Sequence, residues 1–414
     1  MSGTHDVFAF AHIGDLHLEC AGDRNAEDLR AILHEVDGLH RRGLLDFAYL
    51  PGDLAEDGLP AQYAILTEAL AAHPELPVRL IPGDHDRQHG SMAAFDALFA
   101  QVAQGARGGG HAARHHDLPR PDQPTRIAHY YFAETIAGVR CLFLDMVSPG
   151  YGRKGFGLDF RLGPFQLAWF EGELAEAARQ GLPCAVFIHT YPDDLRGHEE
   201  KAALAGLIRG HAVRLVEMGH THYNELAHDG RTLYASARSV GQNEDGSVGY
   251  AVAAIDGAVT SWCFKALDRP LPFTMITSPA DRRLATAPRD GAGPEITVRA
   301  LVLSNAPQAD WCCHARVDHG PAYPMVPAGP RVVEARIPWP DGSRRLSVTV
   351  TDGTRNPRTG KANADTDTIE PVAPGFTPPP APDRPGSDAF RLPAWPEKGI
   401  RGDQLGPNRV GRDW

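Results

Sequence analysis

Short apolar runs and amphipathic stretches alternate along the first part of the chain. The nearly continuous apolar runs at 7–13, 47–50 and 78–81 are short and end at glycine or proline, which predicts buried strands. Between them, 25–41 and 59–72 carry apolar residues at helical spacing. This alternation predicts a largely parallel sheet with right-handed crossovers. The carboxyl ends of parallel strands meet at one edge of such a sheet, where functional groups gather.

The mixed pattern continues to about residue 267. A hairpin signal, Ala137-Gly138, separates two strand-like stretches. A segment rich in glycine, histidine, arginine and proline, 105–124, is expected to form a loop. The other expected elements are helices at 92–102, 163–179 and 199–209, and strands at 130–135, 139–145, 185–188, 213–218, 233–234, 250–255 and 262–264.

The pattern changes near residue 268. Residues 268–293 are rich in proline and weakly periodic, so we expect a linker there. From 294 to 370 the apolar runs are all strand-like, which predicts a small immunoglobulin-like β-sandwich, although the four or five visible strands are fewer than such a sandwich needs. Residues 371–414 form a proline-rich tail whose apolar residues could dock on the body. The expected division is therefore an α/β domain at 1–267, the linker, the all-β domain and the tail.

Length, composition and charge narrow the possible functions. The 414 residues are 42% apolar, enough for a large core, but no run of about 18 apolar residues predicts a membrane span. The amino terminus lacks the charged and apolar regions of a secretory signal, and the six cysteines show no CxxC spacing. We therefore expect a cytoplasmic protein with reduced thiols. The net charge of −11 disfavours a nucleic-acid-binding surface.

Acidic and imidazole side chains recur where the apolar runs end. A binuclear metal centre needs about seven oxygen and nitrogen ligands held rigidly, and strand ends can supply that rigidity. A structural zinc site would favour four ligands, commonly thiolates, and no cysteine lies in these segments. The segments are Gly14-Asp15-Leu16-His17, Gly52-Asp53, Gly83-Asp84-His85-Asp86, His189 and Gly219-His220-Thr221-His222.

The spacing within these segments is compatible with metal binding. Asp15 and His17 are two residues apart and would point the same way on an extended segment, so one cation could take both. His220 and His222 repeat that spacing. Asp53 could offer one oxygen to each of two cations about 3.5–4 Å apart, and a water between such cations would lose a proton near neutral pH. The resulting hydroxide could attack a phosphorus atom in line.

The ordered set resembles the pattern of the calcineurin-like metallophosphoesterases, which is D-x-H, G-D, G-N-H-[DE], a single H and G-H-x-H. The resemblance covers about residues 7–265 and implies a four-layer α/β/β/α sandwich with two mixed sheets. It also implies two divalent or trivalent metal ions, of manganese, iron or zinc. Carried over by position, the first metal would be held by Asp15, His17, Asp53 and His222, and the second by Asp53, Asp84, His189 and His220.

The same resemblance implies roles beyond metal binding. His85 would act near the leaving-group oxygen, as a general acid or a charge stabiliser, and Asp86 would orient His85. Within the family the chain is most similar to bacterial cyclic-nucleotide and glycerophosphodiester phosphodiesterases. The run Gln166-Leu167-Ala168-Trp169-Phe170 and the short spacing of the early segments carry that similarity.

The chain departs from the family pattern where Asp84 replaces asparagine. An ionised carboxylate keeps the ligand oxygen but loses the amide donor and adds negative charge beside the phosphate site. Our hypothesis is that Asp84 tightens the second metal and penalises dianionic monoesters relative to monoanionic diesters.

The leading interpretation is a phosphodiesterase acting on a small phosphoester. A phosphomonoesterase, a pyrophosphatase or a nuclease would need the same centre, and some relatives of this fold are non-catalytic scaffolds. The presence of His85 and of every expected ligand position favours catalysis. No membrane partner is expected, and the C-terminal domain could form a homo-oligomer contact.

Overall fold

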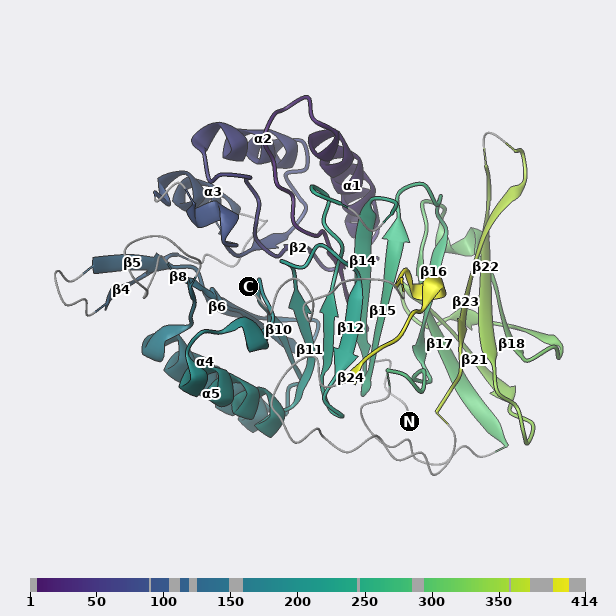
Figure 1. Ribbon diagram of the computed structural model, residues 1–414. Coiled ribbons are helices and arrows are strands. Elements are labelled where there is room, and N and C mark those ends of the chain that lie inside the picture. The colour runs from purple at the N-terminus through teal and green to yellow at the C-terminus, as the bar shows by residue number, and fades with distance from the viewer. Residues whose placement is uncertain are drawn as a thin grey trace.

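The computed structural model describes residues 6–88, 91–103, 112–118, 125–148, 159–243, 246–284, 294–356, 359–372 and 390–401. Two mixed sheets lie face to face, helices cover their outer sides, and an all-β unit packs beside them (Figure 1). This is the α/β/β/α layering that the sequence resemblance implies. Among the described residues, no helix is long and apolar enough to cross a bilayer.

The first sheet has five strands in the order β15-β14-β1-β2-β3. Strands β1, β2 and β3 are parallel, as predicted, but β14 pairs antiparallel with β1, and β15 with β14. A short turn joins β14 to β15, which dictates antiparallel pairing. The bounds are β1 (Phe8–His12), β2 (Ala48–Leu50), β3 (Val78–Leu80), β14 (Gly249–Asp256) and β15 (Val259–Ala266), with helices α1 (Arg24–Arg41), α2 (Pro60–Ala71) and α3 (Ala93–Ala103).

The second sheet has seven strands in the order β24-β12-β13-β11-β10-β7-β6. Its four central strands are parallel, and the outer three run antiparallel to their neighbours. Helices α4 (Gly163–Gln180) and α5 (His198–Gly210) cover its outer face (Figure 1). The strands are β6 (Phe132–Ile136), β7 (Val139–Phe143), β10 (Cys184–Phe187), β11 (Val213–Met218), β12 (Glu225–His228), β13 (Leu233–Ser236) and β24 (Phe390–Arg391).

Aromatic side chains fill the space between the two sheets. The ring of Phe187 on β10 lies 5.2 Å from that of Phe10 on β1 and 4.8 Å from that of Tyr49 on β2. Phe47, just before β2, contacts Phe143 on β7 at 6.3 Å. Edge-to-face pairs of this kind add to the free energy gained by burying the rings. The packed interior therefore fixes the strand ends relative to one another.

The segment expected to be a loop at 105–124 contains a strand. Strand β4 (Arg114–Leu118) pairs with β5 (Thr125–His129), while 104–111 and 119–124 lie outside the described residues. A second small ladder joins β8 (Val147–Ser148) to β9 (Asp159–Phe160). Strand β4 was not predicted because the glycine, histidine and proline residues around it give no apolar periodicity.

The C-terminal unit consists of two four-stranded sheets with apolar residues from both in one core. The expectation of a linker over 268–293 is wrong for 273–278, because β16 lies there and pairs with β17. The sequence pattern did not reveal β16 because prolines flank it, and it did not reveal β23 because that strand is polar. The strands are β16 (Phe273–Ser278), β17 (Glu295–Leu303), β18 (Cys312–Val317), β19 (Ala322–Pro324), β20 (Val326–Pro327), β21 (Val332–Pro338), β22 (Leu346–Arg355) and β23 (Ala362–Ile369).

Candidate metal centre

The structure brings the seven proposed ligand residues together where the two sheets meet. They form two groups of four that share Asp53, and within each group the candidate ligand atoms lie within 4.8 Å of one another. The first group, here called cluster 1, comprises Asp15, His17, Asp53 and His222; the second, cluster 2, comprises Asp53, Asp84, His189 and His220.

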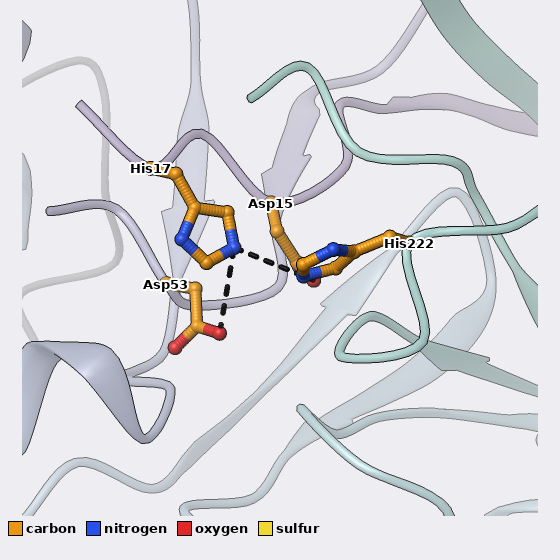
Figure 2. Close-up of side chains that lie close together, drawn as sticks. All are labelled: Asp15, His17, Asp53 and His222. Carbon is orange, nitrogen blue, oxygen red and sulfur yellow. Dashed lines mark hydrogen bonds and ion pairs between the residues drawn. The ribbon is translucent and has the colours of Figure 1, made fainter. Parts of the chain in front are cut away.

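Cluster 1 combines two side chains of the first motif with Asp53 of the second and His222 of the last (Figure 2). The Nε2 atom of His17 lies 3.0 Å from Nε2 of His222 and 3.8 Å from an Asp53 carboxylate oxygen. The carboxylate of Asp15 lies 3.7 Å from Nε2 of His222. These nitrogen and oxygen atoms face a common point, although His17 and His222 are 205 residues apart in sequence.

Cluster 2 shares with cluster 1 the same Asp53 oxygen, Oδ2. The Nε2 atom of His189 lies 3.5 Å from Asp53 Oδ2 and 2.9 Å from Asp84 Oδ1, and Nδ1 of His220 lies 3.1 Å from the same Asp84 oxygen. The Nδ1 atom of His189 donates to the Pro51 carbonyl at 2.9 Å, since a carbonyl can only accept. That bond fixes the tautomer and leaves Nε2 facing the cluster.

The two late histidines enter different clusters, in the division that the family resemblance implies, although their i, i+2 spacing alone would let one cation take both. His17, Asp53, His220 and His222 all have positive φ, at 45°, 49°, 68° and 63°. They are therefore not on extended segments, and the i, i+2 rule for strands does not apply to them. Non-glycine residues in this left-handed region cost free energy and are concentrated at functional sites. The left-handed turns aim neighbouring side chains at separate points.

Two glycines of the motifs make room for ligand atoms. A Cβ atom on Gly83 would lie 2.1 Å from Asp53 Oδ1 and 2.7 Å from a carbon of the His189 ring. A Cβ atom on Gly219 would lie 2.2 Å from Asp15 Oδ1. Close packing of a carboxylate against the backbone thus requires glycine at these two positions.

The carboxylates are buried in a way that calls for a cation. Asp15, Asp53 and Asp84 are almost completely excluded from solvent, and Asp15 Oδ1 has no hydrogen-bond partner among the described residues. Burial, together with the charges of Asp84 and Asp15, raises the pKa of Asp53 well above its usual range. Burying several carboxylates without positive charge is costly, and bound cations reverse the effect. The donor set of oxygens and imidazole nitrogens suits first-row divalent metals.

The pKa values of the histidines are shifted in opposite directions in the two clusters. Burial and the neighbouring imidazoles of His222 and His85 lower the pKa of His17 to about 2. Burial alone would lower the pKa of His189 and His220, but the charge and hydrogen bonds of Asp84 outweigh it and raise both. The same two histidines hold the pKa of Asp84 well below its usual range despite its burial. A metal ion would take the place of these protons, because it binds neutral imidazole.

His85 lies at the open edge of cluster 1. Its side chain is 23% exposed and that of His222 is 21% exposed, whereas the side chains of the other candidate ligands are 9% exposed or less. The His85 ring lies 4.6 Å from the His17 ring, and its Nδ1 donates to the Glu56 carbonyl at 2.6 Å. Its Nε2 is therefore available at the side from which a ligand could approach.

Glu56 is a residue that the sequence reasoning missed. Its carboxylate accepts a hydrogen bond from His17 Nδ1 at 2.8 Å and from Gln242 Nε2 at 2.9 Å. This carboxylate fixes the His17 tautomer so that Nε2 points into cluster 1, as is common for metal-ligating histidines. The only signal in the sequence was an acidic residue three positions after Asp53.

The prediction that Asp86 orients His85 is wrong. Asp86 lies in the short helix η1 (His85–Arg87), and its carboxylate faces the backbone instead of the His85 ring. It accepts hydrogen bonds from four groups, which are the N–H of Gly83 at 2.9 Å, the N–H of Leu54 and of Ala55 at 3.2 Å, and the Tyr63 hydroxyl at 2.8 Å. Asp86 thus ties the loop after Asp53 to the loop that carries Asp84.

The Gln166 run acts at a distance from the clusters. Gln166 is buried on α4, where its side chain accepts from the N–H of Asp145 at 2.8 Å and donates to the Asp145 carbonyl at 2.7 Å. The Asp145 carboxylate in turn pairs with Arg87 at 2.6 Å. Through Asp145 and Arg87, Gln166 therefore supports the short helix that presents His85.

Comparison with known proteins agrees with this geometry. The family model described as calcineurin-like phosphoesterase matches residues 8–224. A probable cyclic nucleotide phosphodiesterase of Rhodococcus erythropolis is 28% identical over 229 residues, which cover 52% of this chain and 65% of that protein. A cAMP/cGMP dual specificity phosphodiesterase of Mycobacterium tuberculosis is 28% identical over 236 residues, or 53% and 63%. The chain therefore spans less than two thirds of the length of each relative.

Among solved structures, a dimetal phosphatase from Danio rerio is similar at 17% identity with a TM-score of 0.46, covering 63% of this chain and 96% of that one. The family model extends over more than half of the chain and includes all seven residues of clusters 1 and 2. The chain belongs to the calcineurin-like phosphoesterase family.

Proposed function

We propose that this protein hydrolyses a small phosphodiester at a site that holds two metal ions. The observation that carries the proposal is the pair of Asp/His clusters that share Asp53 and have His85 at their open edge. The printed names of the two bacterial relatives add support for a cyclic nucleotide as the substrate class.

The proposed metal ligands are those of the two clusters. Asp15, His17, Asp53 and His222 would hold the first metal, and Asp53, Asp84, His189 and His220 the second. When bound, two such ions would neutralise the charge of a phosphate ester and lower the pKa of a water molecule.

The side chains around the clusters have separate tasks in this proposal. His85 would protonate or stabilise the leaving-group oxygen, because its Nδ1 is held by the Glu56 carbonyl and its Nε2 is available to a ligand. The backbone N–H of His85 donates to Asp53 at 2.9 Å, so the proposed acid and the shared carboxylate are held together. Glu56 keeps His17 in the tautomer that metal binding requires.

Asp84 would bias the site toward monoanionic substrates. Its oxygen is already shared by two histidines, and its charge adds to those of Asp15 and Asp53. A phosphodiester carries one negative charge where a monoester carries up to two, so like-charge repulsion penalises the monoester more. This supports a diester over a monoester as the substrate.

We also propose the domain division. The catalytic domain would comprise residues 1–267, with the β-sandwich at 294–370 and strand β16 added to it. The packing of β16 against β17 and the common core of the two C-terminal sheets support that boundary.

The test is turnover of bis(p-nitrophenyl) phosphate by protein supplied in turn with manganese, iron, zinc and cobalt and with its metal content measured. We expect metal-dependent turnover that falls about a hundredfold or more in His85→Ala. The matched control is His198→Ala, an exposed histidine at the start of α5, which should retain wild-type turnover.

A panel of a cyclic nucleotide, a glycerophosphodiester and a phosphomonoester would then identify the substrate class. The proposal fails if metal-loaded protein turns over no phosphoester, or if the monoester is the preferred substrate.

A further inference from the structure

We propose that residues 390–401, here called the strap, position the ligands of cluster 1 through the Gly399 carbonyl. The inference rests on the proposed role of Asp15 and His222 as metal ligands. The strap appears in yellow in Figure 1, where it runs from β24 at the edge of the seven-stranded sheet toward β16 and β23.

One end of the strap is fixed to the edge of the second sheet. Strand β24 pairs antiparallel with β12, and the Leu392 N–H donates to the Leu226 carbonyl at 2.8 Å. Further along, Trp395 is 2% exposed, and the Arg283 guanidinium lies 3.6 Å from the centre of its ring. The burial of this tryptophan and its cation–π contact make the strap part of the folded body.

The other end of the strap is fixed to the β-sandwich. The Lys398 ammonium lies 2.7 Å from the Asp367 carboxylate on β23, and both side chains are buried. The second oxygen of Asp367 accepts from the Ile276 N–H on β16 at 2.7 Å. Removing one partner of a buried ion pair is strongly destabilising, so the Lys398 side chain stays at Asp367. The adjacent Gly399 is therefore held in a defined place.

The Gly399 carbonyl receives two hydrogen bonds from the catalytic domain. The Asn224 side-chain amide donates to it at 3.0 Å and the Arg238 guanidinium at 2.9 Å. Gly399 has φ of 82°, and a Cβ atom there would lie 2.7 Å from Phe264. The carbonyl therefore reaches Asn224 and Arg238 only because the turn is left-handed and lacks a side chain.

Asn224 and Arg238 are joined to each other and to the loop of cluster 1. The Asn224 side-chain oxygen accepts from the Arg238 N–H at 2.7 Å, and Asn224 follows His222 by two residues. The next residue, Ser239, donates from its hydroxyl to the Asp15 carbonyl at 2.7 Å and from its N–H to the His222 carbonyl at 3.3 Å. Hydrogen bonds, together with the peptide bond between Arg238 and Ser239, thus link the strap to two residues of cluster 1.

Cluster 2 shares one hydrogen bond with this set, from the His220 N–H to the Asp15 carboxylate at 2.6 Å, but its other ligands are held elsewhere. His189 is held by the Pro51 carbonyl, and Asp84 precedes the helix η1 that Asp86 ties to the Asp53 loop. The hydrogen bonds that lead from Gly399 end at the backbones of Asp15 and His222. The strap should therefore affect the first metal much more than the second.

The experiment is calorimetric titration of chelator-treated full-length protein with Mn²⁺. Two binding steps are expected and are assigned with His222→Ala, which removes the step of cluster 1, and His189→Ala, which removes that of cluster 2. Two variants then test the strap. Asn224→Asp places a carboxylate against the Gly399 carbonyl but keeps the acceptor for the Arg238 N–H, and Gly399→Ala displaces the carbonyl itself.

We expect both variants to weaken the cluster 1 step by about ten- to a hundredfold, because supporting residues of metal ligands have effects of that size. The cluster 2 step should weaken much less, since only the His220 N–H connects it to Asp15. The matched control is Ser304→Ala, which removes the buried bond from Ser304 to Asp352 within the sandwich and should leave both steps unchanged.

Wild-type affinity at both steps in Asn224→Asp overturns the inference, and so does equal weakening of both steps. If Gly399→Ala does not fold, Asn224→Asp decides the question by itself. Failure of wild-type protein to bind a pair of Mn²⁺ ions would instead refute the proposed function, so the two outcomes are distinct.

Discussion

The carboxylate of Asp86 is expected to contribute to stability and to have no part in setting the protonation of His85. It is fully buried and accepts from three backbone N–H groups and the Tyr63 hydroxyl. A buried donor that loses its acceptor costs about 1–3 kcal/mol. Truncation in Asp86→Ala leaves four such donors, so we expect a loss of about 4 kcal/mol or more in the free energy of unfolding.

Smaller changes at the same place should give smaller losses. In Asp86→Asn the amide oxygen can keep the bonds from Leu54, Ala55 and Tyr63, and the amide nitrogen then faces the Gly83 N–H. One lost acceptor predicts a cost of about 1–3 kcal/mol. Tyr63→Phe removes one donor and should cost about 1 kcal/mol. The order of the three variants is itself a test of the geometry.

The assay is urea denaturation of each variant, together with the pH dependence of kcat on metal-loaded protein. Because typical domains are stable by about 5–15 kcal/mol, Asp86→Ala is expected to unfold at much lower urea concentration while Asp86→Asn remains folded. The reasoning is refuted if Asp86→Ala unfolds within about 1 kcal/mol of wild type. It is also refuted if Asp86→Asn shifts the pH profile without loss of stability, since that result would link Asp86 to His85.

Three further predictions concern the metals. Asp84→Asn should lower the ratio of diester to monoester kcat/KM about tenfold and reduce the metal content of the second site. The reason is that one unit charge at about 5 Å is worth at most about 3 kcal/mol at an effective dielectric of 20. An unchanged ratio with unchanged metal content contradicts this prediction. Glu56→Gln should weaken binding of the first metal about tenfold in a Mn²⁺ titration, and Glu75→Gln, at an exposed position, is the control. Wild-type affinity in Glu56→Gln would exclude a role for Glu56 in holding His17. Chelation should lower the Tm of wild-type protein, because a ligand at a hundred times its Kd stabilises by about 2.7 kcal/mol per site; an unchanged Tm would show that the folded protein holds no metal.

Some features could be read from the sequence because they depend on short segments. The apolar runs before Gly14, Gly52 and Gly83 are local, and each predicted strand is present as β1, β2 or β3. The types of chemical group at the site and their order along the chain were also visible, and all seven candidate ligands lie in the two clusters. A strand end and the metal-binding type of a side chain can each be recognised from a few consecutive residues.

Other features were not visible because they depend on backbone conformation or on residues far apart. The left-handed turns at His220 and His222 send the two side chains to different clusters, and an i, i+2 spacing cannot express that. Strands β16 and β23 were concealed because pairing with distant strands, and not their own composition, makes them strands. Likewise, Asp86 faces four donors from the surrounding loops, which no local pattern records.

The sequence by itself determined which groups are present and that they follow buried strands, because hydrophobic periodicity and motif spacing are properties of adjacent residues. Only the tertiary structure decided which left-handed turns aim those groups at two points, that Glu56 and the strap support the first cluster, and that Asp86 stabilises loops. Hydrogen bonds such as those from Asn224 and Arg238 to Gly399 span more than 150 residues, so they exist only once the sheets have packed.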